Sequence, residues 1–226
     1  MSGSPFRFPF PVKLRRNRRA RRLSLTIDVV DGTALLVLPT KATLREGQNF
    51  LQRQAKWILE ELEKLPPHRP FNDGATFRIL GNRYRIRHLP LLPAQICREG
   101  RDLVVGGYSE PNTKVIKWVK EFAKHSLSEA SASKARSLGI TPPRISIRDP
   151  KSSWGSCSEG GSISFSWRLV LAPPWVMDYV VSHEIAHLLQ FNHSNEFWAI
   201  VQSVCPRYKQ AKLWLKTKGQ CLLRFG

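Results

Sequence analysis

The sequence is poor in acidic residues and in histidine, and it has no long apolar run. It carries 17 Asp or Glu against 36 Lys or Arg, a formal net charge of +19 at pH 7, and only six histidines. A membrane-spanning helix needs roughly 18 or more consecutive apolar residues, so we expect no membrane insertion. Residues 1–12 hold three prolines rather than the apolar core of a signal peptide, which favours a cytoplasmic protein.

The sequence also lacks the closely spaced cysteine pairs that are typical of zinc fingers. The four cysteines, at positions 97, 157, 205 and 221, form no C-x-x-C pair, so a separate zinc finger is not indicated. Nothing points to secretion, and reduced thiols are the default in the cytoplasm. With 226 residues and 42% hydrophobic residues, the chain can bury one large core or two small ones.

Half of the scarce histidines lie in one short stretch. His183-Glu184-Ile185-Ala186-His187 is followed six residues later by His193. On a helix, residues four apart lie on one face, so two imidazoles at this spacing can bind one metal ion. Glu184, beside the first ligand, can reach a water on that metal. The pattern predicts a Zn²⁺ site that hydrolyses peptide bonds, with Glu184 as general base.

The third metal ligand has two candidates in the sequence, His193 and Glu196. Glu196 is the only acidic residue after His187, so a distant glutamate ligand is excluded. Ser194 is typical of a helix N-cap and Glu196 of an acid in the first turn, which makes His193 the expected ligand and Glu196 the alternative. The spacing matches metzincins, but Gln190 replaces their glycine and no Met follows His187.

The helix that carries the first two histidines is expected to begin at the two prolines 173 and 174. Its apolar positions recur at helical spacing, and Asn192 is expected to end it in a left-handed conformation. We also expect one strand within residues 152–168 to align an extended peptide, with Gly155 allowing close approach. Tyr208 is a candidate donor to the oxyanion. The apolar positions are Met177, Val181, Ile185 and Leu188.

Elsewhere the patterns mix strands and helices. The segment 43–65 is expected to be one amphipathic helix. The Gly81-Asn82 pair predicts a type II′ hairpin turn. Strands are expected at 23–29, 34–38, 77–80, 84–86, 103–105, 144–148 and 162–171, and a long helix at 113–138.

Several of these motifs resemble the YgjP-like metallopeptidase family, which is related to SprT-like and WLM-type zincins. They lie at residues 151–157, 163–173, 179–187, 193–194 and 197–198, and the likeness covers nearly the whole chain after residue 12. The resemblance implies His183, His187 and His193 as zinc ligands, Glu184 as base, and a bacterial cytoplasmic setting. Ser153 departs from the larger residue expected before Trp154, and no substrate is implied.

The resulting expectation is an α+β, zincin-like fold, with a mainly antiparallel sheet packed on the active-site helix and an amino-terminal β-hairpin and helix. The expected divisions are a basic, flexible segment over residues 1–22, a β/α region over 23–110, and a metallopeptidase core over 111–226.

Positive charge is concentrated near the amino terminus, with seven Lys or Arg between Lys13 and Arg22. Such a segment attracts nucleic acid, or it forms a solvated basic strand edge. The alternative function is therefore a nucleic-acid-associated protein whose peptidase activity is secondary or switched by binding. A zinc-stabilised scaffold without activity is disfavoured, because a purely structural site needs no Glu184 and usually has four protein ligands.

Overall fold

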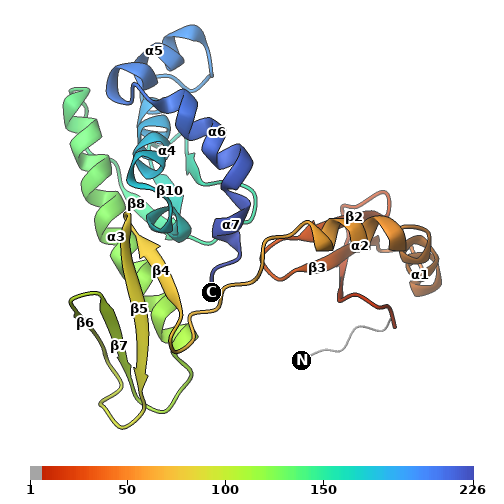
Figure 1. Cartoon of the computed structure of the whole chain (residues 1–226). Coiled ribbons are helices and arrows are strands. Elements are labelled where there is room, and N and C mark those ends of the chain that lie inside the picture. The colour runs from red at the N-terminus through yellow and green to blue at the C-terminus, as the bar shows by residue number, and fades with distance from the viewer. Residues whose placement is uncertain (1–6) are drawn as a thin grey trace. The chain divides into compact units, whose positions relative to one another are not determined.

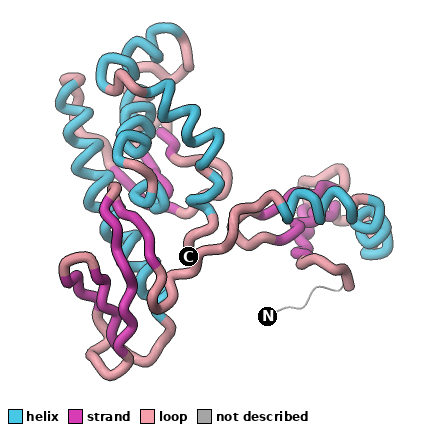
Figure 2. The backbone as a smooth tube through the Cα atoms, viewed as in Figure 1, coloured by secondary structure: helices cyan, strands magenta, loops and turns pink. Residues whose placement is uncertain are grey.

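The computed structural model describes residues 7–226, which form two compact units that divide after His68 (Figure 1). Helices and strands occur in both units (Figure 2), so the α+β prediction is confirmed. Among the described residues, we find no helix with the length and apolar character needed to span a membrane.

The first unit is a three-stranded sheet with two short helices. Its elements are β1 (Val12–Asn17), β2 (Ser24–Asp28), β3 (Thr33–Pro39), α1 (Leu44–Arg53) and α2 (Ala55–Glu63). The central strand β3 pairs with β1 in parallel and with β2 in antiparallel orientation. Alternate residues of β3 are fully buried and share one hydrophobic core with Leu51 and Ile58 of the helices.

The single helix expected over residues 43–65 is instead two helices. The backbone of Gln54 (φ −98°, ψ 4°) leaves helical geometry and separates α1 from α2. The start of α1 is fixed by a capping box, in which the Glu46 amide donates to the Thr43 hydroxyl and the Thr43 amide donates to the Glu46 carboxylate. The break lets both helices direct an apolar residue into the same small core.

The basic amino-terminal segment is partly built into the sheet. Residues 1–6 lie outside the described part of the chain, but β1 pairs with β3 along its whole length, so the expected flexible segment contains an ordered strand. Lys13 forms an ion pair with Asp31 at 2.6 Å. Arg16 donates to three backbone carbonyls at and just after the end of β3, the shortest contact being 3.0 Å to Ala42. These two cations therefore have structural partners within the unit.

The second unit contains two sheets. In the first, the strand order is β4-β5-β7-β6, and in the second it is β8-β10-β9. Each sheet combines antiparallel pairing with one parallel pair, β5 with β7 and β8 with β10. The strands are β4 (Thr76–Ile79), β5 (Asn82–Leu89), β6 (Ile96–Glu99), β7 (Asp102–Gly106), β8 (Ile145–Arg148), β9 (Gly155–Cys157) and β10 (Ile163–Ser166).

The turn between β4 and β5 differs from the expected type II′ turn. Ile79 pairs with Asn82, so the two central residues are Leu80 and Gly81. Both have positive φ (46° and 83°), which is the property of a type I′ turn. The Leu80 amide donates to the Val170 carbonyl at 2.8 Å, and this tertiary contact supports a conformation that is unusual for leucine.

Helices cover both sheets of the second unit. The long helix α3 buries Val115, Val119, Ala123 and Leu127 at a spacing of four residues, and it packs on α4 and η1. The strand expected over 162–171 ends early, because a 3₁₀ helix follows Ser166. The helical elements are α3 (Pro111–Ser137), η1 (Trp167–Leu171), α4 (Pro174–Ala186), α5 (Asn195–Val204), α6 (Tyr208–Lys218) and α7 (Gln220–Leu223).

The compact units do not follow the expected boundary at residue 110. Phe77, Ile86 and Leu103 belong to the same hydrophobic core as Val119 and Leu127 of α3. Strands β4 to β7 are therefore part of the second unit, and the division falls at residues 68–69. Hairpin patterns alone do not reveal this, because they carry no information about which core a strand joins.

Candidate metal centre and catalytic cleft

Helix α4 contains His183, is followed directly by His187, and is enclosed on nearly all sides. It contacts α3, α5, α6, η1 and β9, and nine of its thirteen residues are buried. The expected apolar stripe is buried at Met177, Val181 and Ile185, but Tyr179 and Val180 on another side are buried as well. Burial on several sides is typical of a helix in the protein interior, and close packing there holds its side chains in fixed positions.

The helix ends earlier than expected. Ala186 is its last residue, and His187 is the C-cap with near-helical angles (φ −63°, ψ −20°). Asn192 is not left-handed, since Leu80 is the one non-glycine residue with positive φ in the described chain. Instead, the Asn192 side chain accepts a hydrogen bond from the Ser194 amide at 3.1 Å. This contact shapes the loop that returns His193 to the end of α4.

The three histidines meet in space. Each offers one ring nitrogen, and these nitrogens lie within 4.8 Å of one another. The Nε2 atoms of His183 and His193 are 3.3 Å apart. Three imidazole nitrogens that converge in this way form a donor set that suits one metal ion.

A pair of aromatic residues from α5 supports these rings. Phe197 is fully buried, and its ring centroid lies 4.9, 4.5 and 4.8 Å from those of His183, His187 and His193. Trp198 contacts two of the rings, each with a centroid distance of 5.9 Å. The first turn of α5 therefore fixes the orientation of side chains that come from two separate segments.

The surroundings of His183 and His187 favour the neutral form of the imidazole, which is the form that binds metals. Burial, followed by the neighbouring histidines and Lys212, lowers the pKa of His183 to about 4. Burial also lowers the pKa of His187, although the Gln190 carbonyl opposes this. That carbonyl is 3.1 Å from His187 Nδ1, and a proton on Nδ1 would leave the Nε2 lone pair free for a metal.

Glu196, the alternative third ligand, lies outside the cluster of donor atoms found in the described residues. It is exposed in the first turn of α5, where the neighbouring Ser194 side chain and its own backbone amide lower its pKa. An acidic side chain in the first turn of a helix is favoured by the helix dipole, which agrees with the place that the sequence assigned to Glu196.

Glu184 lies in a small cavity beside the histidines. The cavity has a volume of about 210 Å³, and Glu184 is only 5% exposed. Within the described chain its carboxyl group has no hydrogen bond or ion pair, and burial raises its pKa to about 7. A cation bound by the adjacent imidazoles would favour the carboxylate and lower this pKa. The cavity is lined by Trp154, Gly155, Tyr179, Val180, His183, Glu184 and Leu215.

The sequence did not single out Tyr179, which lines this cavity. It lies four residues before His183 and shares that face of α4, so helical spacing could have identified it. Burial and then Glu184 raise its pKa to about 12, so the phenol keeps its proton. Tyr208, the residue that the sequence suggested, stacks on Trp198 at 5.3 Å and does not line the cavity.

Comparison with known proteins identifies the class of enzyme. The model of the YgjP-like metallopeptidase domain matches residues 21–218, so the chain belongs to the YgjP-like metallopeptidase family. It is therefore a peptidase hydrolase that depends on a metal ion. The crystal structure of the metallopeptidase zymogen of Pyrococcus abyssi abylysin is 27% identical, covering 41% of this chain and 95% of that chain, with a TM-score of 0.37. No curated protein matches the chain.

The contact between Gly155 and Glu184 yields a test of the cleft. A Cβ atom at position 155 would lie 2.7 Å from both Cγ and Oε1 of Glu184, so Gly155→Ala must displace that side chain. Because a misplacement of about 1 Å can cost roughly 100-fold in rate, we expect peptide cleavage to fall about that much. The measurement is kcat/KM on a fluorogenic peptide.

The matched control is Gly160→Ala, because the nearest atom to a Cβ there is Ser158 Oγ at 4.0 Å. Equal cleavage rates for the two alanine variants would show that the position of Glu184 does not matter.

Proposed function

We propose that this metallopeptidase uses Zn²⁺, held by His183, His187 and His193, with Glu184 as the general base. The observation that carries the proposal is the meeting of three ring nitrogens within 4.8 Å beside a buried carboxyl group that has no partner among the described residues. Imidazole ligands suit zinc, whereas magnesium and calcium prefer oxygen ligands. Three protein ligands are typical of catalytic zinc sites, which keep one position open.

A zinc ion at this site would lower the pKa of a water molecule that it binds and would polarise the scissile carbonyl. Glu184 would accept the proton of the attacking water and deliver it to the departing amine. Its buried surroundings suit this exchange, because they bring the pKa of the carboxyl group near neutrality when no cation is present. Trp154 and Leu215 form apolar walls that limit the access of bulk water.

Strand β9 is suited to align the substrate. It is an edge strand of its sheet, since the order is β8-β10-β9, and its first residue, Gly155, lies against Glu184. An extended peptide can add to such an edge through backbone hydrogen bonds, which would hold the scissile bond next to the base. The absence of a side chain at Gly155 allows the close approach of this strand to α4.

Tyr179 is proposed as a donor to the oxyanion. Tyr179 lines the same cavity as Glu184 and His183, and a raised pKa keeps its hydroxyl group protonated at neutral pH. Phenol donors can stabilise the negative charge that develops on the carbonyl oxygen in the transition state.

Replacing Glu184 with Gln should abolish turnover and leave the metal bound, because the amide keeps the shape of the side chain but accepts no proton at neutral pH. Removal of a general base costs about 10²–10⁴-fold in rate. Elemental analysis for zinc and cleavage of a peptide library would be measured on the same preparation. Wild-type turnover by this variant would reject the assignment of the base.

The third ligand is tested by His193→Ala, which should weaken zinc binding at least tenfold, since one of three imidazoles is removed. Competition with a coloured chelator would give the affinity. His125→Ala is the control, because His125 is an exposed residue of α3 whose only close partner among the described residues is Glu129. If the two variants hold zinc equally well, His193 is not a ligand and Glu196 should be tested next.

Replacing Tyr179 with Phe should reduce kcat by roughly 100-fold and change KM little, because the lost hydrogen bond acts in the transition state. The control is Tyr108→Phe, since Tyr108 is 82% exposed and remote from the cavity lining. A matching loss in both variants, or none in Tyr179→Phe, would exclude Tyr179 as the donor.

A further inference from the structure

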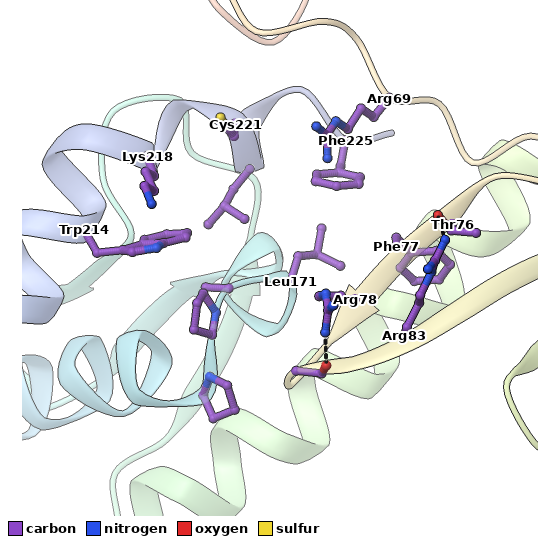
Figure 3. Close-up of a pocket in the computed structure, with 15 residues that line it drawn as sticks. Arg69, Thr76, Phe77, Arg78, Arg83, Leu171, Trp214, Lys218, Cys221 and Phe225 are labelled. Carbon is purple, nitrogen blue, oxygen red and sulfur yellow. Dashed lines mark hydrogen bonds between the residues drawn. The ribbon is translucent and has the colours of Figure 1, made fainter.

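The second unit has a larger pocket that shares no lining residue with the cavity of Glu184. Its volume is about 720 Å³, and it is formed by the β4–β5 hairpin, the start of α4, and the helices α6 and α7 (Figure 3). Side chains of α6 lie on one side of it, and arginines of the hairpin lie on the other. We call it the arginine pocket. Its cationic residues are Arg69, Arg78, Arg83 and Lys218.

The positive charge of the arginine pocket is not neutralised by the protein. No acidic residue lines it, and none of its four cations forms an ion pair with any described residue. The arginines have neutral partners instead: Arg78 donates to the Gly81 carbonyl at 2.8 Å, and Arg83 contacts the Thr76 hydroxyl at 3.5 Å. Each guanidinium group has five N–H donors, so most remain available to an anionic ligand.

A second hollow continues this positive region. It has a volume of about 530 Å³, shares Arg78 and Arg83 with the arginine pocket, and adds Arg98 and Arg101. Clustered charges of one sign raise the local concentration of ligands of the opposite sign. The ligand is therefore expected to carry more than one negative charge.

The arginine pocket also has apolar walls. Trp214 and Phe225 both line it, and Trp214 is oriented by an edge-to-face contact with Trp175, with ring centroids 6.5 Å apart. Arg69 lies over the Phe225 ring at 5.4 Å. A ligand that combines carboxylates with a neighbouring apolar group would satisfy both kinds of surface.

The position of the pocket favours a polypeptide ligand. Pro174 lines it at the start of α4, the helix that carries His183, and on α6 Trp214 faces this pocket while its neighbour Leu215 lines the catalytic cavity. Nine residues of helix separate Pro174 from His183, or about 14 Å. An extended peptide covers that distance with about four residues. A chain bound at the cleft is thus long enough to reach the pocket.

We propose that the arginine pocket is a second binding site for the polypeptide substrate, which recognises an acidic segment with an adjacent apolar residue. The segment lies at least about four residues from the scissile bond. The statement that this polypeptide is a substrate rests on the proposed function. The statement that an acidic polypeptide binds to the pocket is independent of that function. The site would select substrates by their sequence at a distance from the cleaved bond.

The test measures binding without cleavage. The full-length Glu184→Gln protein is titrated into a fluorescent peptide with a Glu-Phe-Glu-Glu tail, and into the same peptide with Gln in place of each Glu. Fluorescence anisotropy should show at least tenfold tighter binding of the acidic peptide. Adding Arg83→Gln and Lys218→Gln should remove most of that preference.

The control adds Arg45→Gln and Arg53→Gln, which remove the same charge from exposed positions on α1 in the first unit. Thermal unfolding of both proteins would show that each is folded. In the enzyme with Glu184 restored, the pocket variant should lower the ratio of kcat/KM for the acidic peptide to that for the Gln peptide about tenfold.

Equal binding of the two peptides, or an equal loss of preference in the pocket and control variants, would overturn the proposal. It would also be overturned if single-stranded oligonucleotides displaced the acidic peptide at far lower concentration, because the pocket would then be a nucleic-acid site. The catalytic proposal is judged separately, on cleavage of the Gln peptide. Pocket-dependent binding of the acidic peptide supports this assignment even where no peptide is cleaved.

Discussion

The enclosure of α4 is the constraint on which the site depends. Two of the three histidines of the site, His183 and His187, are one helical turn apart at the end of α4. The third, His193, lies on the following loop, which has to return to the end of the helix. Phe197 contacts all three rings, and it is itself fully buried. Packing of α5 against α4 therefore couples the formation of the core to the assembly of the donor atoms. The ordering cost of the histidine side chains is met by apolar burial during folding, before any ligand binds.

Burial within the same packed region also disfavours the charged form of Glu184. A buried carboxyl group without a partner disfavours its charged form, which explains its raised pKa. A polar partner for Glu184 from the protein would stabilise that charge, but it would also compete for the proton that a base must accept. The close approach of Gly155 instead supplies backbone and empty volume, so the carboxyl group is positioned by shape. A cation on the neighbouring imidazoles would offset the cost of burial at the point where the charge is used.

The sequence predicted those parts of the site that are local. The His183–His187 spacing lies within one helical turn, and the capping pattern at Ser194 and Glu196 favoured His193, which lies with the other two histidines in the structure. The end of α4 could not be predicted in the same way, because the loop is shaped by the Asn192 contact with the Ser194 amide.

Features that join segments far apart in the chain could not be predicted from the sequence either. The type I′ turn at Leu80 depends on a hydrogen bond to Val170. The unit boundary depends on which core β4 to β7 enter, and the arginine pocket joins Arg69 and Arg83 to Lys218. Periodicity reports the local environment of a residue, whereas these features depend on tertiary contacts.

The net positive charge is a further property that composition alone does not explain, because the fold determines which cations are free to bind a ligand. Several cations of this basic chain are structural: Arg168 is buried against Asp149 and donates to the Phe225 carbonyl, and Lys134 pairs with Asp178 of α4. Such residues carry charge that is already neutralised by the protein or enclosed in its core. Arg83 and Lys218 are exposed, have no acidic partner in the described chain, and face one pocket. An excess of positive charge becomes informative about ligands only after the structurally paired cations are set aside, and four of the cations that remain in the second unit line a single pocket.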